Sequence, residues 1–461
     1  MRQVIIIFFT LLSFPVWAQE KTDYSLKDCI DFALLNQPKM KGALLDEQMQ
    51  VAKNKEVLGL TRPQVNASGQ FQYLFIVPKS RIDADAFDFG SSLSFFKIDT
   101  PAYQAFQAQP KKKYQEAQFG LPLNASLGVT ATQILFDAGV LVALQARASL
   151  EELTRINTQR TAEDVRLAVS KAYYNCQLAD KRMSLLDENI KLIEGLENMT
   201  TKLFKEGFAE RIDADRLTVQ KNNLLTEKTK IQNLVELGYA LLKFQMGMDL
   251  NKPMTLTEKI GIDEVKANLD IDKVPDYNNR TEMSLLKTIK QLNEYDYRRH
   301  QKSYLPTVAA ALSGSYGTQV ISFKDLFTYS YFPTGAFVLS ASMPLYTGGS
   351  RQAKMQQARL SIMKNENDMQ AFQQAVNLET DNARTQLRNS FISLDNQKNN
   401  IELAQKVYDI AQKKYKEGLG SNIEILQAET ALKEAQINFY NTLFEAMLAK
   451  IDYQKAQGQL K

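Results

Sequence analysis

Few side chains in this 461-residue sequence could carry out covalent or metal chemistry. The single histidine, His300, lies in the polar stretch 295–303, where a surface position is expected. The two cysteines, Cys29 and Cys176, lie far apart and suggest neither a disulfide framework nor a metal site, and Cys176 falls on an apolar helical stripe. The sequence contains no glycine-rich phosphate loop or nucleophile elbow. It therefore predicts a protein that is not an enzyme and uses no cofactor or metal.

The strongest candidates for non-covalent chemistry are two copies of one short motif, each followed by a carboxylate. Residues 204–208 (FKEGF) match residues 415–419 (YKEGL), and Asp213 and Glu424 follow at equivalent positions. A glycine in this setting is typical of a turn that ends a helix. An acidic residue at the start of the next helix is favoured by the helix dipole. Each copy therefore indicates a tight turn between two helices.

Two further motifs precede these turns, in the same order in both halves of the chain. Residues 136–139 match 346–349, and residues 62–65 match 305–308. The interval between these two motifs is longer in the first half, where residues 78–118 read as a loop inserted between two strands. Ordered self-similarity of this kind predicts a tandem repeat of one structural unit.

We expect the first repeat to cover residues 19–250 and the second residues 280–461, joined by the linker 251–279. The linker is rich in Pro, Asp and Lys and has no clear periodicity. Each repeat reads as helix, strand, strand, long helix, long helix. The expected elements are a helix over 25–62, strands over about 63–77 and 119–136 and helices over 139–205 and 210–247, then a helix over 281–303, strands over about 306–320 and 335–346 and helices over 349–416 and 421–459.

The four expected strands alternate strictly between apolar and polar residues, which gives each strand one apolar face. Strands of about ten residues with this pattern suit a bilayer-spanning barrel. A soluble sandwich or hairpin would alternate in the same way and remains an alternative. Four strands cannot close a barrel, and open edges are not tolerated in lipid, so several chains would have to contribute. The residues expected to face lipid are Phe71, Tyr73, Leu121, Leu123, Leu312, Tyr316, Phe337 and Leu339.

The segments expected to form long helices carry apolar residues at every seventh position. A seven-residue repeat indicates left-handed coiled-coil packing. At 1.5 Å per residue, the helix over 139–205 would be roughly 100 Å long, a length typical of coiled coils. Three of the rows are 178/185/192/199, 387/394/401 and 425/432/439.

Residues 1–18 have the pattern of a secretory signal peptide, with Arg2, an apolar stretch over 4–15 and small residues before a cleavage site after Ala18. A membrane anchor is the alternative, but the stretch is short for one. Since no later run of about 18 apolar residues occurs, any membrane crossing would use strands. The net charge of +4 does not suggest nucleic acid as a partner.

Together, the signal peptide, the tandem order of elements and the two turn motifs resemble the TolC family of outer-membrane efflux ducts. The segments 26–38 and 423–432 are also similar to that family. The resemblance implies an α+β membrane protein that forms a homotrimer. Three chains with four strands each would form a 12-stranded transmembrane β-barrel. Their long helices would form a coiled-coil barrel in the periplasm.

The resemblance also implies a function, as the channel or exit duct of a tripartite efflux pump or a type I secretion system in the cell outer membrane. Substrates would pass through it passively. The implied partners are outer-membrane lipid, a periplasmic adaptor (membrane fusion) protein and, through the adaptor, an inner-membrane transporter of the RND or ABC type. A structural periplasmic coiled-coil protein without channel activity is the alternative.

By motif position, Asp213 and Glu424 match the acidic residues that line the narrow tunnel mouth in the family, and we expect them at a pore constriction. Two residues depart from the familiar pattern: Gln427 replaces a second acid, and Gly420 stands where an arginine can brace the closed mouth. A position at a helix start would by itself explain both carboxylates.

The turns themselves are the expected contact with the adaptor. The termination of a helix explains Gly207 and Gly418 without a partner. The apolar residues that follow them, Phe208 and Leu419, are better explained by a protein that docks there.

Overall fold

The computed structural model describes residues 22–83, 101, 104, 114–258, 261–267 and 270–460. The expected signal peptide and most of the expected inserted loop lie outside these residues. The chain divides into two compact units. The helical unit is drawn from residues 1–51, 148–294 and 359–461, and the sheet unit from residues 52–147 and 295–358. No helix in the described part of the chain is both long and apolar enough to cross a membrane.

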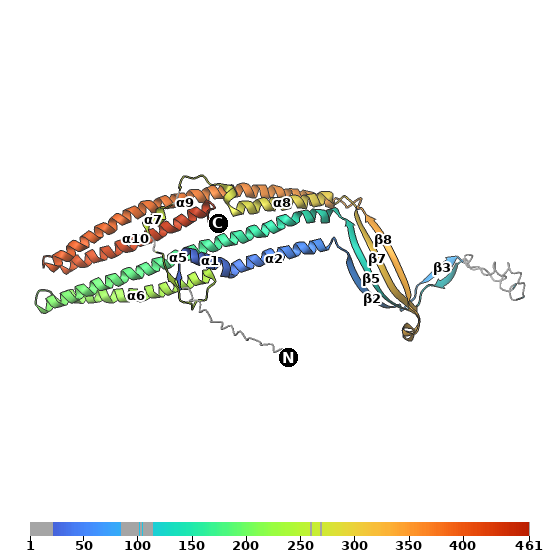
Figure 1. Ribbon diagram of the computed structural model, residues 1–461, viewed down its shortest axis with the longest axis horizontal. Helices are drawn as coiled ribbons and strands as arrows, with labels where there is room; N and C mark the ends of the chain where they lie inside the picture. Colours follow the sequence, from blue (N-terminus) through green and yellow to red (C-terminus); the bar gives the residue numbers. More distant parts are fainter. Residues whose placement is uncertain are drawn as a thin grey trace, which may run out of the picture. The chain divides into compact units, whose positions relative to one another are not determined.

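The sheet unit is built on one antiparallel sheet of four strands in the order β2-β5-β7-β8 (Figure 1). The strands are β2 (Gln64–Tyr73), β5 (Leu123–Phe136), β7 (Thr307–Val320) and β8 (Phe332–Ser342). The two halves of the chain contribute two strands each, and β5 and β7 pair at the centre. Strands β2 and β8 are therefore the edges of the sheet.

The strand register places the alternating apolar residues on one face. Leu312 lies opposite Ala131 on β5 and Phe337 on β8, and Leu127 lies opposite Gly69 and Tyr316. Residues that lie directly opposite each other in an antiparallel pair share a face of the sheet. The other face carries mainly Gln, Asn, Ser and Thr side chains. The sheet is thus amphipathic, as the period of two predicts.

A short 3-10 helix between β7 and β8, η3 (Phe323–Phe327), packs against one end of the apolar face. Leu326 of this turn packs with Leu123 and Val320, and the ring centroid of Phe323 lies 6.2 Å from that of Phe71. A separate antiparallel pair, β3 (Lys79–Asp83) with β4 (Tyr114–Gln118), lies within the segment expected to be an inserted loop.

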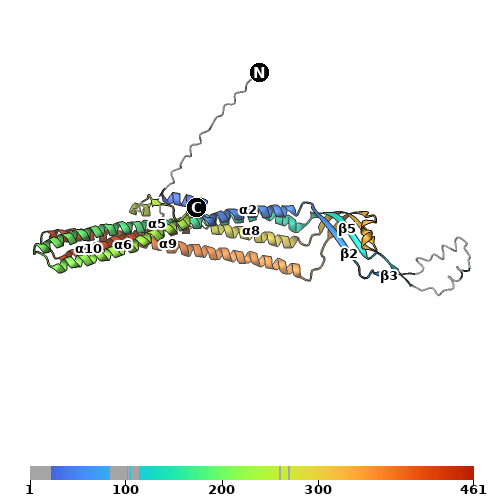
Figure 2. The same cartoon turned by 90° about the horizontal axis from the view of Figure 1, so that it is seen from below.

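The helical unit contains two long helical hairpins (Figure 1, Figure 2). One is formed by α5 (Ala138–Lys205) and α6 (Arg211–Met246), the other by α9 (Ser350–Lys416) and α10 (Asn422–Ala456). Shorter helices are α1 (Leu26–Asn36), α2 (Pro38–Gly59), α7 (Ile262–Lys266) and α8 (Thr281–Lys302). These long helices and the four-stranded sheet confirm the fold class predicted from the sequence.

The single helix expected over 25–62 is wrong, because the chain forms α1 and α2 with a break at Gln37. Gln37 is extended, with ψ 126°. Pro38 disfavours a helical conformation for the residue before it and has no N–H to donate, but it fits the first position of a new helix. A capping box formed by Ser25 and Asp28 stabilises the start of α1.

The two hairpins share a hydrophobic core near their turns. Leu217 and Leu224 of α6 and Ile425 and Leu432 of α10 are at most 2% exposed, and all four belong to one buried cluster with residues of α5 and α9. These pairs stand seven residues apart, so the heptad rows read from the sequence are the buried seams. Cys176 is buried, as expected, in a separate cluster with residues of α1 and α6.

Candidate functional site

The turn from α5 to α6 ends its helix with two backbone hydrogen bonds. Phe208 N–H donates to the Leu203 carbonyl at 2.8 Å, and Gly207 N–H donates to the Phe204 carbonyl at 3.0 Å. Gly207 has φ +81°, in the left-handed region that favours glycine. This is the Schellman arrangement, which satisfies the last carbonyls of a helix.

The turn from α9 to α10 repeats this geometry. Leu419 N–H donates to the Lys414 carbonyl at 2.9 Å, Gly418 N–H donates to the Tyr415 carbonyl at 3.2 Å, and Gly418 has φ +72°. The residue after the glycine in this motif commonly packs against the end of its own helix. Here that residue, Phe208 or Leu419, is about four-fifths exposed, at 80% and 78%. Both turns therefore present an apolar side chain to their surroundings.

The two candidate carboxylates lie in the first turns of α6 and α10, and each has a basic neighbour. Asp213 lies 3.6 Å from Arg216 on the same helix. Glu424 lies 3.2 Å from Lys414, which belongs to the preceding helix α9. The N–H of Glu424 donates to the capping hydroxyl of Ser421 at 3.2 Å. The negative charge at each turn is thus partly compensated within its own hairpin.

Buried polar contacts hold the two turns together. The side-chain amide of Asn422 donates to the Asp213 carbonyl at 2.9 Å, and Asn422 is only 5% exposed. Farther from the turns, the hydroxyls of Thr200 on α5 and Tyr415 on α9 lie 2.6 Å apart in a hydrogen bond. The structure therefore brings the two candidate carboxylates to the same end of the helical unit.

Six of the eight residues expected to face lipid are between 51% and 69% exposed on the apolar face of the sheet: Phe71, Tyr73, Leu312, Tyr316, Phe337 and Leu339. Leu121 precedes β5 and is only partly exposed. Leu123 is 6% exposed because η3 covers it, so in this chain it packs against Leu326 rather than lying open. The loop between β7 and β8 is rich in apolar and aromatic residues, such as Phe323, Leu326 and Phe327, but it has no period that would predict contact with the sheet.

The residues best suited to covalent or metal chemistry do not gather into a site. Cys29 and Cys176 are buried, and no disulfide joins them in the described part of the chain. His300 is more enclosed than expected, with a side chain 19% exposed and its Nε2 3.5 Å from Asp296. Within the described ranges, no group of three or more His, Cys, Asp or Glu residues could hold a metal ion.

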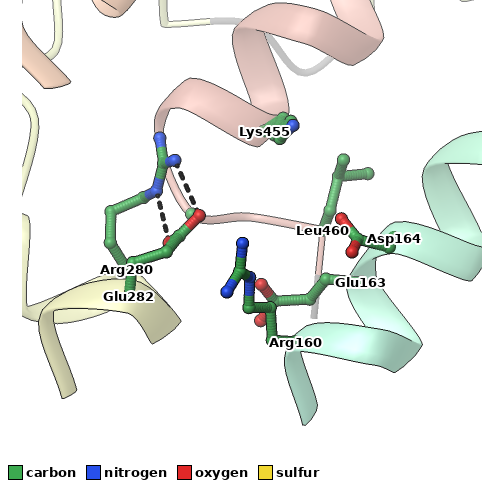
Figure 3. Close-up of a pocket in the computed structure, with 8 residues that line it drawn as sticks. Arg160, Glu163, Asp164, Arg280, Glu282, Lys455 and Leu460 are labelled. Atoms are coloured by element: carbon green, nitrogen blue, oxygen red, sulfur yellow. Dashed lines mark hydrogen bonds and ion pairs between the residues drawn. The ribbon is translucent and has the colours of Figure 1, made fainter. Parts of the chain in front are cut away.

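A charged cluster lies where the start of α8 meets the end of α10 (Figure 3). Arg280, at 5% exposure, binds Glu282 and Glu379 and donates to the Ala456 carbonyl at 3.1 Å. The cavity beside it holds about 20 Å³, room for about one water molecule. This cluster is therefore a structural tie between the segment before α8 and the C-terminal end of α10.

Arg280→Ala is expected to lower the free energy of unfolding by about 3 kcal/mol, the lower end of the range for a broken buried pair. Glu379 remains partly exposed to water, which softens the loss. Arg388→Ala is the matched control, because its ion pair with Asp272 is exposed and should contribute less than about 1 kcal/mol. Thermal unfolding of the purified protein in detergent compares the two, and equal effects would contradict this assignment.

Comparisons with known proteins add to this geometry. The family model described as outer membrane efflux protein matches residues 282–452. The chain is 22% identical over 365 residues to the probable efflux pump outer membrane protein TtgC of Pseudomonas putida, covering 76% of this chain and 72% of the relative. It is 21% identical over 360 residues to outer membrane protein TolC of Escherichia coli, covering 75% and 72%. Its fold is similar to the crystal structure of CusC, with a TM-score of 0.70 and 15% identity over 94% of this chain and 91% of that one.

Proposed function

Since this chain belongs to the TolC family of outer membrane efflux proteins, which are channels and not enzymes, we propose that it is the passive exit duct of a tripartite pump and works as a homotrimer. One observation carries the proposal. In the described part of the single chain, the sheet unit has two unpaired strand edges and the helical unit has exposed apolar rows. Further copies of the same chain would cover both surfaces. The alternative, a structural coiled-coil protein, gives no reason for an open amphipathic sheet.

The edges of the sheet suit addition of further copies. Every neighbouring pair in β2-β5-β7-β8 is antiparallel, so the two edge strands β2 and β8 run in opposite directions. Strand β8 of one copy could therefore pair with β2 of the next and continue the antiparallel pattern. Unpaired backbone groups are not tolerated in lipid, which favours a closed ring of copies. The number three, and hence twelve strands, rests on the family.

The long helices suit the same arrangement. Helix α6 carries an exposed row of apolar residues at heptad spacing, which we call the α6 seam: Leu234, Leu237, Leu241 and Phe244, exposed by 53%, 66%, 43% and 67%. Helix α9 carries a similar row, Leu403, Val407 and Ile410, exposed by 62%, 48% and 59%. Two unpartnered apolar rows on one chain fit a head-to-tail contact between copies, as in a coiled coil.

At the turns, symmetry would repeat Asp213 and Glu424 around a narrow mouth. Carboxylates that converge on an aqueous constriction focus a negative potential, attract cations and slow anions. Arg216 and Lys414 would weaken this potential without abolishing it, since both carboxylates keep contact with water.

The double variant Asp213→Ala with Glu424→Ala is expected to reduce the preference for cations of channels reconstituted in planar bilayers. Reversal potentials in a salt gradient measure that preference. Asp215→Ala is the control, because Asp215 lies near the same turn but is 67% exposed and pairs with Arg211. An unchanged reversal potential in the double variant would contradict the proposed carboxylate ring. A wild-type protein that conducts no ions would contradict the proposed duct.

The exposed Phe208 and Leu419 are the surface that a periplasmic adaptor would contact, because large apolar side chains at an exposed turn mark protein contacts. Through the adaptor, an inner-membrane transporter of the RND or ABC type would supply the energy. The sheet would lie in the outer membrane, with the helices in the periplasm.

A further inference from the structure

Helix α10 carries a carboxyl group in the core between the hairpins. Glu429 is 1% exposed, and neither of its carboxyl oxygens has a hydrogen-bond partner among the described residues. Its helix neighbours Ile425, Ala428 and Leu432 belong to the buried cluster that the two hairpins share. Buried carboxylates are normally paired or hydrogen-bonded, because an isolated charge in an apolar core is costly. Glu429 therefore needs an explanation.

The charged and titratable groups around Glu429 do not neutralise it. On its own helix, Lys433 stands one turn further along, but its ammonium lies 2.6 Å from the carboxylate of Glu227 on α6. On α9, the Tyr408 hydroxyl accepts a hydrogen bond from Gln412 at 3.3 Å. Arg182 on α5 donates to the side-chain oxygen of Asn441. Burial raises the pKa of Glu429 to about 7, against the opposing attraction of Lys433.

Lys433 has a second carboxylate within reach and space in which to move. Residues four apart on a helix are neighbours on its surface, so the Lys433 ammonium can reach either Glu429 or Glu227. A cavity of about 270 Å³ lies beside it, between α5, α6 and α10. Lys433 and Glu227 both line this cavity, and Asn189, which is 3% exposed, lines it from α5.

We propose that Glu429 is a proton-binding site whose occupancy decides which carboxylate Lys433 binds. With the proton bound, Glu429 is neutral and Lys433 stays on Glu227, which ties α10 of one hairpin to α6 of the other. When Glu429 loses the proton to solvent, its carboxylate draws Lys433 back onto α10. The tie between the hairpins is then lost.

The direction of the pH dependence follows from the raised pKa. The folded protein holds this proton more tightly than the unfolded chain, whose glutamate titrates near 4.5. The contribution of Glu429 to stability is therefore fully present below about pH 4.5 and is lost as the pH rises through about 7. The hairpins are expected to be tied more firmly in mildly acidic solution than above neutral pH.

Infrared spectroscopy of the full-length protein in detergent tests the proton site directly, because a protonated carboxylic acid has its own carbonyl band. We expect a band at pH 6 that disappears by pH 8, with a midpoint near 7, and that is absent from Glu429→Gln. Glu434→Gln is the matched control, an exposed glutamate on the same helix that should leave the band unchanged. A band that persists in Glu429→Gln, or none above pH 5 in the wild type, would overturn the proposal.

Two further variants test the sharing of Lys433. Glu227→Gln frees Lys433 for Glu429 and is expected to lower the midpoint by about one pH unit, while Lys433→Met removes the attraction of the neighbouring ammonium and should raise it. Glu236→Gln, an exposed change on α6, is the control. A midpoint that Glu227→Gln does not move would refute the switch. These readouts need no ion conduction, so their failure is distinct from failure of the proposed duct.

Discussion

Lysine in place of both Leu312 and Phe337 is expected to abolish insertion of the protein into the outer membrane. These residues lie opposite each other on β7 and β8 and are 61% and 69% exposed on the apolar face. A lysine that faces lipid near the middle of a membrane strand costs about 2–4 kcal/mol. Repetition of two such changes in every copy of the proposed closed sheet would multiply the penalty. Membrane fractionation after export measures the inserted amount.

The matched control places lysines on the other face of the same strands. Ser313 and Ala336 are also an opposed pair, one residue along from the first, so their side chains point to the polar face. Ser313→Lys with Ala336→Lys should leave insertion largely intact, because that face would meet water. Equal loss in both double variants would show that lysine disrupts the sheet generally. Normal insertion of both double variants would mean that the apolar face does not meet lipid.

Leu237→Lys with Leu241→Lys is expected to convert the proposed homotrimer to monomers. Both residues lie in the α6 seam, and burial of a leucine at an interface contributes about 1.5–3 kcal/mol. Charged side chains there would oppose the apolar row of the next copy, and cyclic symmetry would repeat the defect at every contact. Light scattering of the detergent-solubilised protein measures its mass.

The control for the seam is Gln232→Lys with Glu236→Lys. These positions are exposed on α6 but lie away from the seam, so the protein should remain a trimer. A trimer that survives the seam variant would place the contact between copies elsewhere on the helices. Dissociation of the control would mean that added charge on α6, and not loss of apolar contact, is responsible.

Predictions from the sequence were most accurate where the spacing of apolar residues determines the local structure. Alternation with period two assigns Leu312 and Phe337 to one face of the sheet without knowledge of the fold. Heptad spacing similarly assigns Leu217 and Leu224 to a buried seam. The expected helix over 25–62 failed for a local reason, since Pro38 ends α1 and starts α2.

The turns could be predicted because glycine at a left-handed position is a local requirement. The partners of the candidate carboxylates could not be predicted from the sequence. Asn422 reaches the Asp213 carbonyl only because two hairpins from opposite halves of the chain pack together. The pairing of Glu424 with Lys414 depends on the geometry of the intervening turn. Burial of Glu429 has the same origin, since a polar residue in a heptad helix reads as solvent-facing until the packing partner is known.

The repeat correspondence at the turns also shows how the two copies have diverged. The alignment of the two repeats that matches Asp213 with Glu424 can be continued along the helices. In this alignment Glu429 corresponds to Thr218, an exposed residue whose hydroxyl donates to Glu197. In the same alignment, Lys433 corresponds to Asn222. A gene duplication that leaves one copy to maintain the scaffold frees the other to acquire a costly buried ionisable group. In a ring of such chains, every second hairpin would then carry a group that responds to pH, and the hairpins between them would not.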